Sequence, residues 1–96
     1  MVNEGDWRIV FVEDLRGVKL RFQKYTRWSE TWDHDHCAAC GAKFAEHEGL
    51  DILQEGYATC EDYPSGAQYE WVCKTCFHEL QPVLYWYDEN GGKFPN

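Results

Sequence analysis

Four cysteines in two closely spaced pairs are the residues of this chain best suited to chemistry. Cys37 and Cys40 form the first pair, and Cys73 and Cys76 form the second. A two-residue spacer lets both sulfurs of a pair reach one metal ion, and two such pairs supply the four soft ligands of a tetrahedral zinc site. The sequence therefore predicts one structural zinc ion bound by Cys37, Cys40, Cys73 and Cys76.

The residues beside each pair predict how it is held. Gly41 directly follows the first pair and permits backbone angles that other residues avoid, which favours a tight knuckle. Trp71 and Val72 precede the second pair like the end of a strand, and Phe77 to Leu80 follow it like the start of a helix. The second pair would then lie on the first helical turn, where free N–H groups and the helix dipole favour thiolates. A knuckle, a hairpin and a ligand-bearing helix make up the treble-clef arrangement.

Two histidines, His34 and His36, alternate with aspartates immediately before the first pair. In His-Cys nucleases built on a treble clef, such a string lies between the two cysteine pairs. The order found here therefore argues against a hydrolytic metal site, because it does not bring the catalytic groups together. The alternatives are that one histidine donates a ring N–H to a ligand sulfur or a carbonyl, or that it replaces one cysteine as a ligand.

The fifth cysteine, Cys60, stands outside both pairs and has no basic neighbour in the sequence. An unpaired cysteine is most often a small buried apolar residue, and we predict that role here. A fifth metal ligand and a reactive thiol are the alternatives.

Length and composition indicate one small folded domain over residues 1–96. The chain is 44% hydrophobic and 17% aromatic, which is too apolar for a disordered chain. A chain of 96 residues is near the lower size limit at which a hydrophobic core alone stabilises the fold, so a bound metal is expected to add stability. No cationic start precedes an apolar run, and no apolar stretch approaches about 18 residues. We therefore expect a cytoplasmic protein without membrane insertion.

The charge of the chain is strongly negative and unevenly distributed. The net charge is −8; residues 1–28 hold six basic and four acidic groups (+2), and residues 29–96 hold three basic and thirteen acidic groups (−10). Zinc with four thiolates would make the second part −12, since it adds four negative and two positive charges. Such a surface repels nucleic acid and favours a basic partner protein.

The N-terminal part, residues 1–28, is predicted to form a β-hairpin. The run from Trp7 to Val12 is rich in β-branched and aromatic residues, which favours a strand buried on both faces. Asp14 to Gly17 can turn the chain, and Val18 to Gln23 alternates between apolar and polar residues as a second strand. A bulge or strand end is expected near Lys24. The outward row is predicted to be a solvated face, with contact to an acidic or phosphate partner as the alternative; it consists of Lys19, Arg21 and Gln23.

The rest of the chain is predicted to build the zinc core over residues 32–87, with Phe44 packed over the zinc. A short helical turn is expected from Ala45 to Leu53, and two strands, Gln54 to Cys60 and Ala67 to Val72, are expected to pair through a turn at Glu61 to Gly66. A C-terminal helix is then expected to end at Asn90 to Gly92, with a bend caused by Pro82. Its apolar stripe consists of Phe77, Leu80, Val83, Leu84, Trp86 and Tyr87. The predicted fold class is therefore α+β.

Three segments together resemble a family of small, uncharacterised bacterial treble-clef zinc proteins. They are His34-Asp-His-Cys37-Ala-Ala-Cys40-Gly-Ala-Lys-Phe44, Glu55-Gly56-Tyr57-Ala-Thr59 and Trp71-Val-Cys73-Lys-Thr-Cys76-Phe77. The resemblance covers residues 32–87 and leaves the N-terminal part outside. It implies a cytoplasmic zinc protein with Cys37, Cys40, Cys73 and Cys76 as ligands, and it brings no activity.

Three classes of function follow from the sequence. The favoured one is a non-enzymatic protein in which zinc is structural and the surface binds a basic protein, for instance a toxin or nuclease held in check. The second is a nucleic-acid-binding zinc finger that uses the basic strand and exposed aromatic residues. The third is an enzyme, either a His-Cys type metal-dependent nuclease or a redox protein that uses one cysteine pair.

Overall fold

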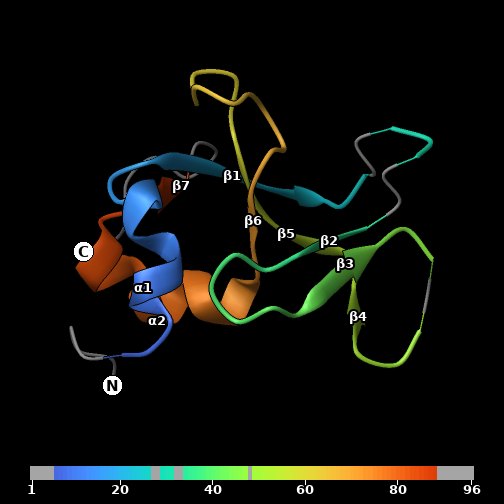
Figure 1. The fold of residues 1–96 in the computed structure, drawn as a ribbon, viewed down its shortest axis with the longest axis horizontal. Helices are drawn as coiled ribbons and strands as arrows, with labels where there is room; N and C mark the ends of the chain where they lie inside the picture. The colour runs from blue at the N-terminus through green and yellow to red at the C-terminus, as the bar shows by residue number, and fades with distance from the viewer. Residues whose placement is uncertain (1–5, 27–28, 32–33, 48, 89–96) are drawn as a thin grey trace.

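The computed structural model describes residues 6–26, 29–31, 34–47 and 49–88, which form a small α+β fold with two sheets (Figure 1). One sheet has the order β6-β5-β1-β7, with β1 at Lys19–Lys24, β5 at Glu55–Thr59, β6 at Trp71–Val72 and β7 at Tyr87–Asp88. The other has the order β2-β3-β4, with β2 at His34–His36, β3 at Lys43–Ala45 and β4 at Ile52–Leu53. The helices are α1 at Ile9–Val12, the 3-10 helix η1 at Glu13–Leu15, and α2 at Lys74–Leu84.

The N-terminal segment is helical, so the predicted strand from Trp7 to Val12 is wrong. Ile9, Val12 and Leu15 recur every three residues and are buried, whereas Val10 and Phe11 are 67% and 59% exposed. Only one face of this segment contacts the core. Helical spacing buries one face in this way, whereas a strand buried on both faces would have every residue buried. The β-branched composition was a weak guide because strand preference depends on the surroundings.

The predicted N-terminal hairpin over residues 1–28 is also wrong, because β1 finds its partners far along the chain. It pairs antiparallel with β5, from Leu20 opposite Thr59 to Lys24 opposite Glu55, and parallel with β7. The strand ends at Lys24, as predicted. The N-terminal part and the predicted core at 32–87 therefore share one sheet.

The outward row of β1 is half-buried rather than fully solvated. Arg21 lies 2.8 Å from a carboxylate oxygen of Glu61, and Lys19 lies 3.8 Å from one of Asp62. These acidic groups follow β5, the neighbouring strand. The basic groups of β1 therefore contact carboxylates of the chain itself.

The predicted helical turn from Ala45 to Leu53 is wrong. β3 ends at Ala45, the chain bends, and β4 runs parallel to β3 with Ile52 opposite Lys43. Asp51 has a φ of 65°, a left-handed conformation that a right-handed helix excludes. Glu48, at the middle of this segment, lies outside the described residues.

The predicted hairpin between the cysteine pairs is confirmed as β5 and β6, with Tyr57 opposite Val72. β6 is shorter than predicted, because the buried side chain of Thr59 hydrogen-bonds to the backbone of the residues that precede β6. Its hydroxyl donates to the Gly66 carbonyl at 2.9 Å and accepts from the N–H groups of Tyr69 at 2.9 Å and Glu70 at 3.2 Å. The loop before β6 is thus held by the Thr59 side chain together with backbone hydrogen bonds between Thr59 and both Gln68 and Glu70.

Helix α2 ends at Leu84, so the predicted end at Asn90 to Gly92 is wrong; these three residues lie outside the described part. Tyr85 adopts a left-handed φ of 60° and closes the helix. Trp86 then turns into the core and donates its indole N–H to the Leu15 carbonyl at 2.8 Å. β7 then pairs with β1, which takes the chain away from the axis of α2, so the helix cannot continue past Leu84.

We predict that Gly56→Ala destabilises the fold. A Cβ on Gly56 would lie 2.7 Å from the ring of Phe44 and 3.0 Å from the Val72 carbonyl oxygen, and both are held in the core. Overpacking of this kind costs about 1–3 kcal/mol. Chemical denaturation measures the loss, with Gly49→Ala as the control because a Cβ there meets only the side chain of Ile52. Equal stability of the two variants would contradict the packing described for Phe44.

Candidate metal centre

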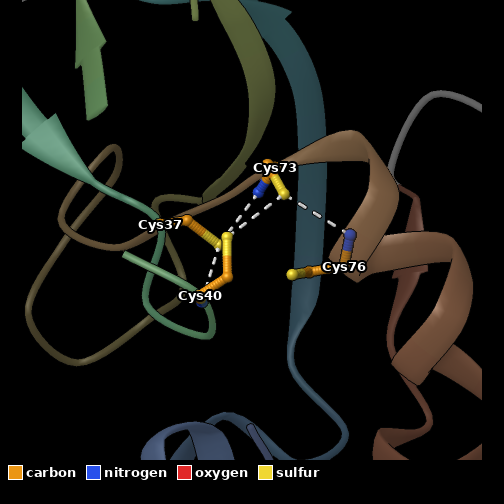
Figure 2. A group of neighbouring side chains, drawn as sticks. All are labelled: Cys37, Cys40, Cys73 and Cys76. Atoms are coloured by element: carbon orange, nitrogen blue, oxygen red, sulfur yellow. Dashed lines mark hydrogen bonds between the residues drawn. The ribbon is translucent and has the colours of Figure 1, made fainter. Parts of the chain in front are cut away.

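The structure brings the two cysteine pairs together. The four sulfurs of Cys37, Cys40, Cys73 and Cys76 all lie within 4.8 Å of one another (Figure 2). The Cys40 and Cys73 sulfurs are 3.8 Å apart. Zinc–sulfur bonds of about 2.3 Å in a tetrahedron place the sulfurs about 3.8 Å apart, so the cluster fits a four-coordinate ion such as zinc.

The first pair occupies the turn of the β2–β3 hairpin. The Cys37 N–H donates to the Ala42 carbonyl at 2.7 Å, and the Gly41 N–H donates to the Cys37 carbonyl at 2.9 Å. Gly41 has a φ of 86°, the left-handed conformation that glycine adopts at little cost. The predicted knuckle and the predicted role of Gly41 are confirmed.

The second pair lies at the junction of β6 and α2, as predicted. Cys73 caps the helix in an extended conformation, and its sulfur accepts the Cys76 N–H at 3.4 Å. The strand before it is bound to the knuckle, because the Ala38 N–H donates to the Trp71 carbonyl at 2.8 Å. This backbone hydrogen bond therefore links the segments that carry the two pairs.

The four sulfurs lie close enough that the pKa values of these thiols depend on one another. Hydrogen bonding with Cys73 and Cys76 lowers the pKa of Cys37. The hydrogen bond to Cys37 in turn raises the pKa of Cys73 to about 11, and it also raises that of Cys76. A divalent cation between the sulfurs would replace these protons as the compensating charge.

The cluster is buried on one side and open on the other. Cys37, Cys73 and Cys76 are buried, whereas Cys40 is exposed. A hollow of about 860 Å³ adjoins Cys40 and Cys73, with the side chains of Lys24 and Lys74 in its lining. Solvent and small reagents therefore reach the cluster from the Cys40 side.

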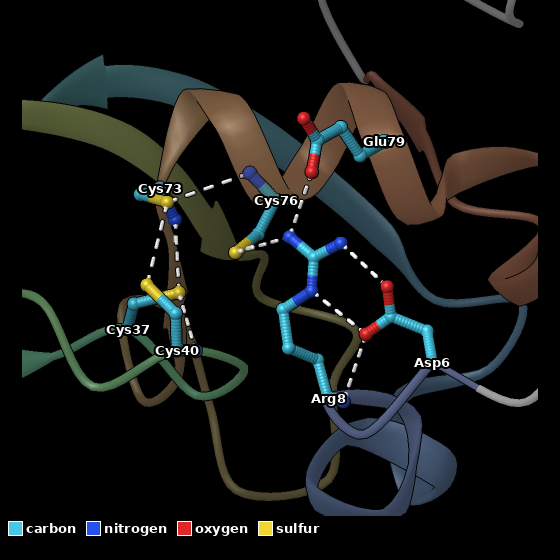
Figure 3. A network of polar contacts seen from close by, with 7 residues as sticks. All are labelled: Asp6, Arg8, Cys37, Cys40, Cys73, Cys76 and Glu79. Atoms are coloured by element: carbon cyan, nitrogen blue, oxygen red, sulfur yellow. Dashed lines mark hydrogen bonds and ion pairs between the residues drawn. The ribbon is translucent and has the colours of Figure 1, made fainter. Parts of the chain in front are cut away.

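Arg8 contacts the cluster, which sequence reasoning missed. Its Nη1 donates to the Cys76 sulfur at 3.4 Å and to a Glu79 carboxylate oxygen at 2.9 Å, while Nε and Nη2 contact the Asp6 carboxylate at 2.9 and 2.8 Å (Figure 3). This hydrogen bonding lowers the pKa of Asp6 to about 2 and raises that of Arg8. In the sequence, Arg8 is a single basic residue within a segment predicted as a strand, so no local pattern indicated this contact.

The two histidines lie on β2 with their rings 5.1 Å apart. Among the residues that the structure describes, the candidate metal cluster consists of the four cysteines and contains neither His34 nor His36. The alternative in which a histidine replaces a cysteine ligand is therefore wrong. Asp35, between them, accepts the Tyr25 hydroxyl at 2.8 Å, and Asp33 lies outside the described residues.

Cys60 lies directly after β5, is buried and forms no disulfide. It is absent from the sulfur cluster, so the fifth-ligand alternative is wrong and the predicted burial is confirmed.

Comparisons with protein-family models, curated proteins and solved structures returned no match. The resemblance to bacterial treble-clef proteins therefore stays a prediction, and the site is interpreted from its geometry. No helix within the described ranges is both long and apolar enough to cross a membrane.

We predict that iodoacetamide alkylates Cys40 first in zinc-saturated protein. Cys40 is exposed, whereas the other three cysteines are buried and the sulfur of each accepts an N–H donor. Peptide mass mapping after brief treatment with limiting reagent measures the order of labelling, and buried Cys60 serves as the internal control. First labelling at Cys37, Cys73 or Cys76 would contradict the prediction.

Proposed function

We propose that this protein is a non-enzymatic zinc-binding module whose surface binds a basic protein. The observation that carries the proposal is the four-sulfur cluster, with all sulfurs within 4.8 Å of one another. Four protein ligands complete the tetrahedral coordination of zinc and leave no position for a catalytic water, which is typical of structural sites.

The zinc ion would join two parts of the fold that are distant in sequence. Cys37 and Cys40 belong to the β2–β3 hairpin, whereas Cys73 and Cys76 belong to the start of α2. Metal binding that requires both parts contributes its free energy to folding, which matters in a chain of 96 residues. A knuckle in a hairpin turn and a ligand pair at a strand–helix junction support assignment to the treble-clef class.

The metal proposal predicts one zinc per chain and five thiols after unfolding in chelator. Cys76→Ser should weaken zinc binding by more than the roughly 10- to 100-fold typical of losing an outer partner, because a direct ligand is lost. It should also lower the melting temperature.

Cys60→Ser is the matched control, since Cys60 is buried but outside the cluster. Elemental analysis, chelator competition and thermal unfolding measure these quantities. Metal-free protein of unchanged stability would disprove the structural role.

The exposed apolar surface formed by α1 and by Trp7 just before it is the best candidate for the protein contact. Trp7, Val10 and Phe11 are 63%, 67% and 59% exposed, and the rings of Trp7 and Phe11 lie 6.0 Å apart. Clustered apolar groups with a polar rim mark contact surfaces. The exposed acidic residues Glu13 and Asp14 follow directly, and the chain carries a net charge of −8. This combination fits a basic protein surface with an apolar pocket.

The ion pairs of β1 favour a protein partner over nucleic acid. Arg21 and Lys19 contact Glu61 and Asp62, so phosphate groups would have to displace these carboxylates. Binding to phosphate gains its affinity from cationic side chains that release counterions.

We predict that Phe11→Ala abolishes capture of a basic protein partner, because it removes an exposed apolar anchor. Leu50→Ala is the matched control, since Leu50 is an exposed apolar residue away from α1, at 92%. Affinity capture at low and high salt, with identification by mass spectrometry, makes the comparison. The expected partner is basic, is retained by wild type and Leu50→Ala, and is released by salt. Unchanged capture by Phe11→Ala would refute the α1 surface, and retardation of RNA or DNA in a low-salt gel shift would favour the nucleic-acid alternative.

A further inference from the structure

We propose that Arg8 is an outer hydrogen-bond partner of the metal centre that couples zinc binding to the docking of α1. This inference rests on the zinc site proposed above. Arg8 directly precedes α1, and its guanidinium reaches the Cys76 sulfur at 3.4 Å (Figure 3). The contact joins residues 68 positions apart in the sequence.

Two carboxylates hold the guanidinium in this orientation. Asp6 accepts from both Nε and Nη2, and Glu79 accepts from Nη1, the same nitrogen that donates to Cys76. The Arg8 side chain is only 11% exposed. A planar guanidinium fixed by a two-point contact has little freedom to turn away, so Nη1 stays directed at the sulfur.

The four sulfurs receive different support. The Cys37 sulfur accepts the backbone N–H groups of Cys73 at 3.3 Å and Cys40 at 3.5 Å, and the Cys73 sulfur accepts that of Cys76. Within the described part of the chain, Arg8 is the only charged side chain hydrogen-bonded to any of the four sulfurs. A zinc ion with four thiolates carries a net charge of −2, so a cation at this position stabilises the metal-bound state.

The Arg8 contact makes metal binding and N-terminal docking mutually dependent. A docked segment that raises zinc affinity must itself be stabilised by zinc by the same factor, since coupling between two equilibria is reciprocal. The surface proposed for the partner lies on the same segment, with Trp7 just before α1 and with Val10 and Phe11 in it. Zinc occupancy would therefore regulate how firmly that surface is held in place.

The test replaces Arg8 by methionine, which keeps an aliphatic stem but removes the charge and the donors. Loss of an outer partner typically costs about 10- to 100-fold in metal affinity, and we expect a loss in this range by chelator competition. Arg16→Met is the matched control: Arg16 also binds the N-terminal segment to α2, through the Val83 carbonyl at 2.7 Å, but it contacts none of the sulfurs. Its zinc affinity should equal that of wild type.

Two further readouts separate this role from a merely structural ion pair. In cobalt-substituted protein, Arg8→Met should move the sulfur-to-cobalt charge-transfer band to lower energy, because a thiolate without its hydrogen bond is more easily oxidised. Amide hydrogen exchange over residues 9–15 should be slowed by zinc in wild type and in Arg16→Met, and slowed less in Arg8→Met.

The outcomes distinguish this inference from the zinc proposal. Wild type that binds no zinc would refute the zinc site itself. Wild type that binds one zinc, with Arg8→Met equal in affinity and cobalt spectrum, would refute only the role of Arg8. Should Arg8→Met fail to fold, Arg8→Gln decides: an affinity below that of wild type, with Arg16→Gln unchanged, supports the role. Equal affinity of Arg8→Gln and wild type refutes it.

Discussion

Mutual repulsion of four sulfurs held within 4.8 Å of one another is the constraint on which the rest of the structure depends. Thiolates at such spacing need positive charge, and the fold supplies part of it from backbone N–H groups and from the first turn of α2. Arg8, itself paired with Asp6 and Glu79, adds a cationic hydrogen-bond donor on the Cys76 side of the cluster. Four sulfurs placed in this way could hold a metal ion, and the donor set favours a soft, tetrahedral one.

The two ends of the N-terminal segment are attached to α2 by different chemistry. At its start, Arg8 contacts Glu79 and the Cys76 sulfur. At its end, Arg16 and Gly17 donate to the carbonyl groups of the last helical turn, and Trp86 donates to Leu15. These bonds satisfy carbonyl groups that a helix leaves unpaired at its C-terminus. The apolar residues between the two attachments then fill the core on one face and leave the other face outward.

The sequence predicted the parts of the site that local chemistry determines. The cysteine spacing, Gly41 and the strand-to-helix change at Cys73 are short-range features, and the structure agrees with each. The β5–β6 hairpin was also predictable, because a strong turn separates two apolar runs. The identity of the ion and the treble-clef assignment go beyond what these features determine.

Long-range contacts account for what sequence reasoning missed. The run around Ile9 became helical because the core accepts only one of its faces, and α2 ended at Leu84 because Trp86 and β7 are held by residues near the N-terminus. Arg8 belongs to no motif, and its role arises only when α1 packs against α2. Each of these outcomes depends on a partner that no local window of sequence contains.

The position of β1 has a consequence for how the chain is made. β1 lies between β5 and β7, so the first strand to leave the ribosome has no partner until Glu55–Thr59 emerges, and its second edge stays open until Tyr87–Asp88 follows. All four cysteines emerge before that last strand. Assembly of the four-sulfur cluster can therefore precede completion of the sheet, because all of its cysteines come before β7 in the sequence.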